Sequence, residues 1–285
     1  MKKVLVTGAT GFIGNYIVSD LLDRGFSVIA SSGTEEKARQ ATWFARSIFV
    51  PFDFKSFEQS VNYFDFFRRP DLMIHLAWEG LPNYKSSFHL EENLPRHKDL
   101  LGNLIKNGLS DLTVTGTCLE YGMQEGRLKE DMPASPSNSY AIAKNELRKF
   151  LETLQQQHFF SLKWVRLFYL YGKGQNPNSL VSQLEKAITQ GDKVFNMSGG
   201  EQVRDYLPVE KVAEYIVKIS LQDKVNGIVN CCSGEPVSVK EFVKRYLNKI
   251  NKNISLNLGH YPYTDYEPMQ FWGDNNKLKS ILNNE

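Results

Sequence analysis

Residues 4–14 read V-L-V-T-G-A-T-G-F-I-G, and this stretch decides the fold. The apolar run at residues 4–6 is typical of a strand that is buried on both faces. Glycines follow at positions 8, 11 and 14. In a turn from strand to helix they let the chain turn tightly, let a pyrophosphate approach the main chain, and let helix and strand pack closely. The free N–H groups at the start of the helix then bind the anion.

The residues around the glycines have the pattern that this interpretation needs. Apolar residues recur at helical spacing after Gly14, Gly25 is placed as a helix C-cap, and residues 26–30 form a second apolar run. The order strand, helix, strand predicts an α/β fold of the Rossmann type, with a doubly wound parallel sheet. Glycines at this spacing also occur in turns that bind nothing, so a purely structural turn is the alternative.

Composition narrows the class of protein. With 285 residues, the chain is long enough for one large α/β domain and a smaller lobe. The net charge is +2 and there is no block of Lys and Arg, so we expect no nucleic-acid partner. The three cysteines are typical of buried thiols in a reducing compartment. The N-terminus resembles neither a signal peptide nor a membrane span, so we expect a cytoplasmic protein with no membrane partner, and we expect no metal.

Three further motifs lie downstream. Residues 72–78 read L-M-I-H-L-A-W, and residues 116–122 read G-T-C-L-E-Y-G after an expected strand. Tyr140 and Lys144 are four residues apart, on one face of an expected helix. With residues 7–14, which match T-G-x-x-G-[FY]-[IL]-G throughout, these motifs resemble the extended branch of the short-chain dehydrogenase/reductase superfamily. That branch includes NAD(P)-dependent nucleotide-sugar epimerases, dehydratases and reductases.

The resemblance implies that Thr117, Tyr140 and Lys144 are catalytic. A free tyrosine titrates near pH ~10, and an adjacent ammonium lowers this by about 1 to 3 units, so we expect Lys144 to lower the pKa of Tyr140. Tyr140 then exchanges a proton with a substrate oxygen while a nicotinamide exchanges hydride with the carbon. Thr117 hydrogen-bonds the same oxygen, and Lys144 also holds the nicotinamide ribose.

A dinucleotide site follows from the same resemblance. Ser31 and Ser32 stand where an acidic residue would select NAD through the ribose 2′-hydroxyl. With Lys37 and Arg39 nearby to accept a 2′-phosphate, we expect a preference for NADP (NADPH). NAD is the alternative, in which these two cations only solvate a helix. Besides Tyr140 and Lys144, the expected cofactor-binding residues are Gly8, Thr10, Gly11, Phe12, Ile13, Gly14, Ser31, Ser32, Asp53, Phe54, Leu76, Ala77 and Trp78.

A nucleoside-diphosphate sugar is the expected substrate, because the resemblance continues through residues 166–175 and 202–206. Tyr84 and His89 lie in an expected loop at residues 79–92, and such loops carry ligand contacts in open α/β sheets. In relatives an arginine like Arg204 is directed at the diphosphate. Tyr169 replaces the asparagine that usually contacts the sugar nucleotide, so contacts there differ. The expected substrate-binding residues are Tyr84, His89, Cys118, Tyr169, Gln175 and Arg204.

We expect two lobes. A dinucleotide-binding domain covers residues 1–171, with residues 207–231 returning to it, and residues 172–285 form most of a smaller α/β substrate-binding lobe. The resemblance also implies a homodimer through the helices near residues 93–108 and 139–158.

Residues 118–120 separate the candidate reactions. Dehydratases of the family carry an acidic residue where this chain has Cys118 or Leu119, and Glu120 is expected to point the other way. A 4-ketoreductase and a 4-epimerase remain, and an NADP-type pocket favours net reduction. We therefore predict a reductase of a 4-keto-6-deoxy nucleotide-sugar, which the resemblance assigns to bacterial surface-polysaccharide synthesis. The alternatives are a 4-epimerase and a non-catalytic, dinucleotide-binding redox sensor.

Overall fold

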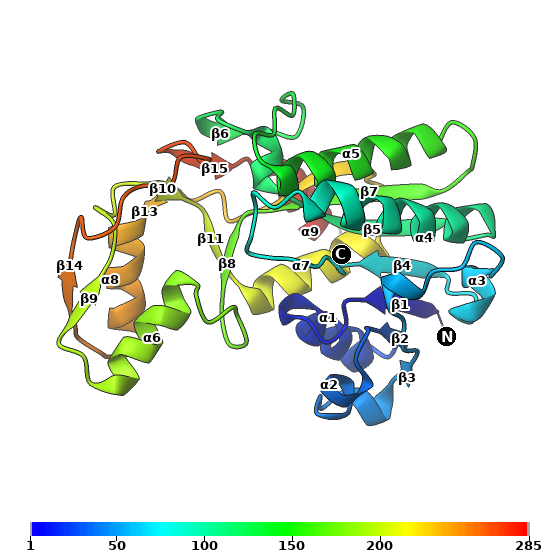
Figure 1. Cartoon of the computed structure of the whole chain (residues 1–285), viewed down its shortest axis with the longest axis horizontal. Coiled ribbons are helices and arrows are strands. Elements are labelled where there is room, and N and C mark those ends of the chain that lie inside the picture. Colours follow the sequence, from blue (N-terminus) through cyan, green and yellow to red (C-terminus); the bar gives the residue numbers. More distant parts are fainter. Residues whose placement is uncertain (1, 284–285) are drawn as a thin grey trace.

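A computed structural model of the chain describes residues 2–283 and contains a seven-stranded parallel sheet (Figure 1). The strands of this sheet are β1 (Lys3–Thr7), β2 (Ser27–Ser31), β3 (Ile48–Phe49), β4 (Leu72–His75), β5 (Asp111–Thr117), β7 (Ser161–Leu167) and β12 (Gly227–Cys231). Their spatial order is β12-β7-β5-β4-β1-β2-β3. The chain winds outward in both directions from the β1–β4 pair, and a crevice therefore forms where the carboxyl ends of these strands meet.

Helices cover both faces of the sheet. The helices of the described chain are α1 (Phe12–Asp23), α2 (Glu35–Arg39), α3 (Tyr63–Phe66), α4 (Leu94–Lys106), α5 (Ser139–Leu154), α6 (Leu180–Gln190), α7 (Val209–Leu221), α8 (Val239–Lys249) and α9 (Asn276–Leu282). Of these, α6 and α8 belong to the smaller lobe and do not cover the sheet. Successive strand residues point to opposite faces. Val4 and Val6 accordingly pack in the core beneath α1 and α7, whereas Leu5 packs beneath α4 and α5. This arrangement is the Rossmann-type fold expected from the N-terminal stretch.

A smaller lobe lies on the left in Figure 1. Its strands pair two by two: β8 (Tyr169–Tyr171) with β11 (Tyr206–Pro208), β10 (Val203–Arg204) with β13 (Val237–Ser238), and β9 (Val194–Asn196) with β14 (Ser255–Asn257). β15 (Phe271–Gly273) pairs with β6 (Gly126–Leu128) of the other half. α6 and α8 enclose a separate apolar core that includes Leu184 and Val243.

The chain returns to the large sheet twice after entering the smaller lobe. β12 pairs with β7, and α7 packs on α1. In addition α9 packs on α7 and β12, so the last described helix lies against the large sheet. The division into two domains at residue 171 stays a prediction.

The segment at residues 57–69 is strongly aromatic, and its spacing predicts a helix that covers the sheet with Tyr63, Phe64, Phe66 and Phe67 in the core, but the structure differs. Only α3 is helical, and Phe66 is 41 % exposed rather than part of the core. Arg68 and Arg69 have φ values of 60° and 52°, a left-handed conformation that ends the helix before Pro70. Tyr63 and Phe67 are buried as expected.

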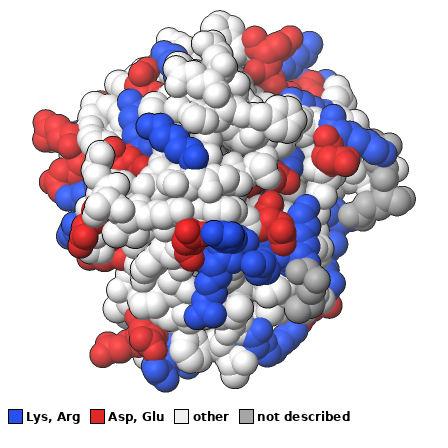
Figure 2. Space-filling model, turned by 90° about the vertical axis from the view of Figure 1, so that its right-hand side faces the viewer, with Lys and Arg blue, Asp and Glu red and all other residues white. Residues whose placement is uncertain are grey.

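Charges of both signs are interspersed on the face shown in Figure 2, where Lys and Arg side chains in the lower half lie next to Asp and Glu side chains. Within residues 2–283 no helix combines the length and apolar character that crossing a membrane requires.

Candidate active site

A cavity of about 420 Å³ opens at the carboxyl ends of the central strands and extends to the smaller lobe. Its wall is mostly apolar and comes from both halves of the chain. The lining residues are Gly8, Gly11, Phe12, Ile13, Gly14, Leu76, Trp78, Leu81, Pro82, Tyr84, Gly116, Thr117, Cys118, Leu119, Tyr140, Leu167, Phe168, Tyr169, Leu170, Gln175, Asn176 and Glu267.

The glycine turn forms one end of this cavity. Gly8 has a φ of 73°, and a Cβ atom there would lie 2.8 Å from the backbone nitrogen of Ala77. A Cβ atom on Gly14 would lie 2.1 Å from the carbonyl oxygen of Gly8. Gly11 is the N-cap of α1 and provides no side chain to its free N–H groups. The turn therefore leaves backbone donors open towards the cavity, which fits the pyrophosphate of a dinucleotide.

Thr117 ends β5 and begins a 3-10 turn, η4 (Cys118–Tyr121). Its Oγ1 accepts a hydrogen bond from the backbone N–H of Leu119 at 3.2 Å. The same hydroxyl lowers the pKa of the Tyr140 phenol, and Thr117 and Tyr140 line the same cavity. The structure thus brings together two of the three residues that were expected to be catalytic.

Tyr140 lies in the first turn of α5, whose N-cap Asn138 accepts from the N–H of Ala141 at 2.9 Å. Rings surround its phenol: the centroid distances are 5.5 Å to Tyr84, 6.1 Å to Trp78 and 5.4 Å to His89. This burial raises the pKa of Tyr140, and the Thr117 hydroxyl only partly opposes it. The expected lowering of this pKa by Lys144 is therefore wrong, because desolvation is the largest effect.

Lys144 lies one turn further along α5 and is 2 % exposed. Its Nζ donates to the carbonyl oxygen of Thr115 at 2.8 Å and lies 4.2 Å from the centroid of the Trp78 ring. Burial lowers the pKa of Lys144 to about 7, while the negative charge of Glu120 raises it. The ammonium is thus held beneath the cavity wall.

Two histidines contact the Trp78 side chain. The ring of His97 stacks on Trp78 at a centroid distance of 4.7 Å, and the indole Nε1–H of Trp78 donates to Nδ1 of His89 at 3.1 Å. His75 shares hydrogen bonds with Thr7 at 2.7 Å and with His97 at 2.8 Å. His75 is therefore a fully buried, hydrogen-bonded core residue. His89, expected to contact substrate, is buried behind Trp78 instead of lining the cavity.

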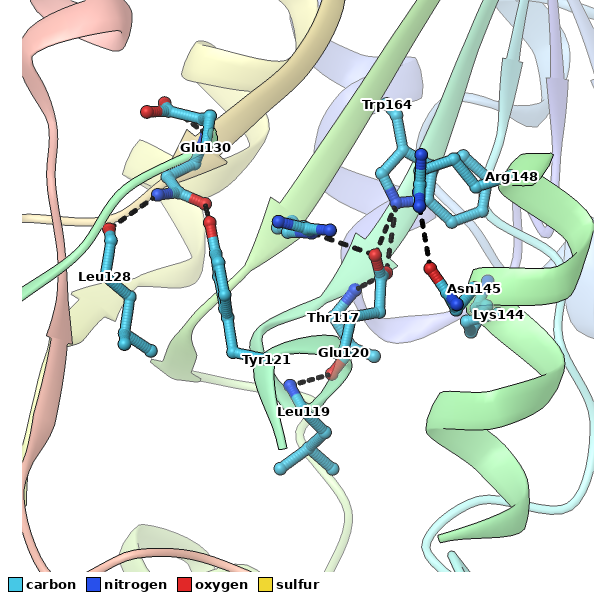
Figure 3. A network of polar contacts seen from close by, with 12 residues as sticks. Thr117, Leu119, Glu120, Tyr121, Leu128, Glu130, Lys144, Asn145, Arg148 and Trp164 are labelled. Carbon is cyan, nitrogen blue, oxygen red and sulfur yellow. Dashed lines mark hydrogen bonds and ion pairs between the residues drawn. The ribbon is translucent and has the colours of Figure 1, made fainter. Parts of the chain in front are cut away.

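Glu120 is fully buried on the side of η4 that faces away from the cavity (Figure 3). Its carboxylate accepts from the backbone N–H of Thr117 at 2.9 Å. It also accepts from Nε1 of Trp164 at 3.0 Å and from Nε of Arg166 at 2.9 Å. The expectation that Glu120 points away from the substrate is confirmed, and Cys118 and Leu119 line the cavity in its place.

The far end of the cavity belongs to the smaller lobe. Tyr84, Cys118, Tyr169 and Gln175 line it as expected, but Arg204 does not. The guanidinium of Arg204 is buried, donates from Nη2 to Glu267 at 3.1 Å, and donates from Nε to the hydroxyl of Tyr169 at 3.3 Å. Arg204 is thus already paired, and Glu267 is the charged side chain that faces the cavity.

The residues expected around the adenosine lie outside the cavity lining, as do Thr10 and Ala77. Ser31 is buried at the end of β2, where its carbonyl oxygen accepts from the N–H of Ala9 at 3.1 Å, and Ser32 is half-buried. Asp53 accepts from the N–H of Lys55 at 2.9 Å, and Phe54 packs on His97. Arg39 pairs with Glu35 at 2.5 Å.

Several lining residues were not foreseen from the sequence. Leu81 and Pro82 lie in a loop that was expected to contact ligands, but no pattern singled them out. Glu267 lies between Tyr266 and Pro268 in a segment where no motif was recognised, and a lone Glu there gives no sequence signal of a binding site.

Comparisons with known proteins match most of this sequence to a family of enzymes. The model of the NAD dependent epimerase/dehydratase family matches residues 4–232. The chain is 29 % identical over 272 residues to dTDP-6-deoxy-L-talose 4-dehydrogenase (NAD(+)) of Aggregatibacter actinomycetemcomitans, covering 95 % of this chain and 99 % of that protein. It is 26 % identical over 267 residues to UDP-glucose 4-epimerase of Azospirillum brasilense, covering 85 % of this chain and 76 % of the relative.

A solved structure has the same fold. The crystal structure of UDP-glucuronic acid 4-epimerase from Bacillus cereus, in complex with UDP-glucuronic acid and NAD, superposes with a TM-score of 0.84. The superposition covers 99 % of this chain and 93 % of the other, at 21 % sequence identity. At that identity the likeness concerns the fold alone.

Proposed function

Since the chain belongs to the NAD dependent epimerase/dehydratase family, we propose that it is an NAD(P)H-dependent reductase of the 4-keto group of a nucleotide-activated 6-deoxysugar. The observation that carries this proposal is that Thr117 and Tyr140 both line the wall of the cavity. The name of the Aggregatibacter relative supports it, because a 4-dehydrogenase of a 6-deoxy nucleotide-sugar catalyses the same redox step in the opposite direction. The resemblance places such a reaction in surface-polysaccharide synthesis.

Thr117, Tyr140 and Lys144 have separate roles in the proposed reaction. Because burial raises the pKa of Tyr140, its phenol keeps its proton at neutral pH and is suited to donate it to a developing alkoxide. Thr117 orients the same oxygen through its hydroxyl. Lys144, one helical turn after Tyr140, would hold the nicotinamide ribose. A bound dinucleotide supplies the hydride.

The side chains of η4 argue against dehydration. Removal of water needs an acid and a base near the sugar, but Cys118 and Leu119 occupy the lining positions. Burial raises the pKa of the Cys118 thiol, so it remains neutral, and Glu120 is committed to Trp164 and Arg166. Reduction needs only Thr117, Tyr140 and Lys144.

For the cofactor we propose NAD(H). The Aggregatibacter relative is named as an NAD(+) enzyme, and the comparisons give no support to a preference for NADP. Arg39, one of the two cations expected to accept a 2′-phosphate, is paired with Glu35. Ser31 and Ser32 place no carboxylate where it would repel a 2′-phosphate, so NADP is the second candidate cofactor.

A 4-epimerase is the second candidate, because the Azospirillum relative carries that name and the same three residues suffice for it. A non-catalytic redox sensor has less support, because Tyr140 lines the cavity and Lys144 is buried one helical turn away, against the lining residue Trp78. The homodimer through α4 and α5 and a cytoplasmic location remain proposals. Sedimentation of the purified protein tests the first of these.

The deciding experiment mixes the protein with 4-keto-6-deoxy sugars carried on dTDP, GDP and UDP, each with NADH and with NADPH. We expect oxidation of NADH with at least one substrate and a product that NMR identifies as the 4-hydroxy sugar. If no member of the panel oxidises either dinucleotide, the reductase proposal is wrong.

A further inference from the structure

Glu120 is a buried carboxylate that the proposed reaction does not use. It is fully enclosed, yet three groups from two strands donate to it: the backbone of β5 through Thr117, and the side chains of Trp164 and Arg166 from β7 (Figure 3). Burying an ion pair costs as much desolvation energy as its attraction returns, so such a pair is weak support for stability. Glu120 lies directly behind the cavity wall, and a role in the active site would explain why this buried carboxylate is present.

The strand end is shaped around this carboxylate. A Cβ atom on Gly116 would lie 2.4 Å from Oε1 of Glu120 and 2.2 Å from Nε1 of Trp164. Position 116 therefore accepts only glycine if the three groups are to meet. The guanidinium of Arg166 is fixed further by Tyr121, over whose ring its Cζ lies at 4.3 Å.

Glu120 restrains the turn that carries Thr117. A capping box joins them: the Glu120 carboxylate accepts from the Thr117 N–H, and the Thr117 hydroxyl accepts from the Leu119 N–H. The two bonds fix both the backbone and the side chain of Thr117. The oxygen of Thr117 is consequently held towards Tyr140 rather than being free to rotate.

Glu120 also faces Lys144 electrostatically. The titratable groups around the Lys144 ammonium are His75 of β4, His97 of α4, His89 of η3 (His89–Asn93), Tyr140 of α5 and Glu120 of η4. Burial lowers the pKa values of the three histidines, which stay neutral at pH 7. Burial likewise keeps Tyr140 in its neutral form. Glu120 is then the group of this set that supplies negative charge.

We propose that Glu120 is a positioning residue of the active site, which acts through Thr117 by a backbone hydrogen bond and through Lys144 by its charge. This inference rests on the proposed function only for the roles of Thr117 and Lys144. The placement of the carboxylate behind both residues is independent of the substrate.

The test uses 19F NMR of the protein containing 5-fluorotryptophan. The chain has four tryptophans, and two of them report on this arrangement: the ring of Trp78 lies under the Lys144 ammonium, and Trp164 donates to Glu120. Resonances are assigned with Trp→Phe variants. In the wild-type protein the Trp78 signal should titrate near the pKa of Lys144, about 7, and this step should vanish in Lys144→Met.

In Glu120→Gln we expect the midpoint of the Trp78 titration to fall by about one pH unit or more, because the opposing negative charge is gone. The matched control is Tyr121→Phe. It removes a buried hydrogen bond from the same turn, the 2.8 Å bond from the Tyr121 hydroxyl to Oδ1 of Asn230, but keeps the carboxylate. The control should leave the midpoint unchanged.

If Glu120→Gln does not fold, a second variant is used in its place. Glu120→Gln combined with Arg166→Met removes both charges, and such replacements of buried pairs are often tolerated. An unchanged Trp78 midpoint in whichever variant folds overturns the proposal. So does a midpoint that shifts equally in Tyr121→Phe, because loosening of the turn then explains it.

Kinetics complete the test. With the substrate found by the panel above, the alkaline limb of the kcat profile should shift with the Trp78 midpoint, while KM changes less than about threefold. If no substrate is found, the proposed function fails while the NMR result still stands. An NMR shift without any change in the kcat profile limits Glu120 to a structural role and overturns the inference.

Discussion

The ammonium of Lys144 lies 4.2 Å from the centroid of the Trp78 ring and donates to the carbonyl oxygen of Thr115 at 2.8 Å. A cation buried on an aromatic face retains attraction from the ring quadrupole but loses its hydration. Lys144 is thereby fixed next to the cavity at a cost in stability.

Replacing Lys144 by Met should lower turnover by about 10² or more and yet stabilise the fold at neutral pH. The pKa of Lys144 is about 7 in the folded protein and near its ordinary 10.5 when unfolded. Between about pH 7 and pH 10.5 the unfolded chain binds more protons than the folded chain, so the free energy of unfolding of the wild type rises with pH. Burial of the charged Lys144 therefore costs, below about pH 7, its full amount, of order a few kcal/mol. Urea unfolding at pH 6 to 10 measures this. Lys149→Met, on the exposed side of α5, is the control, and a variant no more stable than wild type at pH 7 contradicts the account.

Tyr140→Phe should reduce kcat by about 10² to 10⁴ because the proton donor is lost. Binding of the dinucleotide, followed by fluorescence titration, should change less than about threefold, since the ring remains. Tyr16→Phe, which loses only a hydroxyl bonded to the carbonyl of Lys173, serves as the control. Retention of wild-type turnover in Tyr140→Phe would exclude this residue as the acid.

Gly14→Ala should abolish dinucleotide binding, because its Cβ atom would lie 2.1 Å from the carbonyl oxygen of Gly8 and force the turn apart. Gly102→Ala in α4 is the matched control: its Cβ atom meets only Phe150, at an ordinary 3.5 Å. That change should keep binding intact and leave or raise the melting temperature, as alanine is the better helix former. Calorimetric titration with NADH compares the two, and equal affinities would show that the turn does not hold the cofactor.

We expect the free energy of unfolding to fall at acidic pH because His75 is buried in its neutral form. Burial lowers its pKa to about 3, so the unfolded chain binds a proton that the folded chain refuses, and stability falls as pH drops from about 6.5 towards 3. Denaturation at pH 7, 6, 5 and 4 should show a shallower pH dependence in His75→Gln than in wild type. His260→Gln, on an exposed segment, should keep the wild-type slope. Identical slopes in all three proteins would mean that His75 is protonated in the fold.

Glu267 should discriminate against acidic sugars. Its carboxylate faces the cavity, whereas the nearby cation of Arg204 is already paired with it. We expect UDP-glucuronate to bind at least about tenfold more weakly than UDP-glucose, a difference that Glu267→Gln should narrow. Equal binding of the two by the wild-type protein would contradict this.

The sequence predicted best where one local pattern determines a structure. Residues 7–14 specify a turn in which Gly8 and Gly14 leave no room for a Cβ atom, and the strand, helix and strand around it determine the fold. Thr117 and Tyr140 meet as foreseen, because a strand end and a helix start at adjacent positions of one sheet edge bring them together.

Long-range packing could not be read from the sequence. The pKa of Tyr140 depends on rings contributed by Tyr84, Trp78 and His89, whose burial outweighs the nearby ammonium. Arg204 matched a motif, but its partner Glu267 is 63 residues away. A partner that distant in an unpatterned segment leaves no local signal.

The measurement that tests the central proposal most directly follows deuterium from NADH that carries deuterium at both C4 positions of its dihydronicotinamide. With the 4-keto nucleotide-sugar that the protein accepts, we predict one deuterium at C4 of the product sugar for each NADH oxidised. Interconversion of two 4-epimers without consumption of NADH, and without deuterium in either, would contradict reduction and identify the protein as a 4-epimerase.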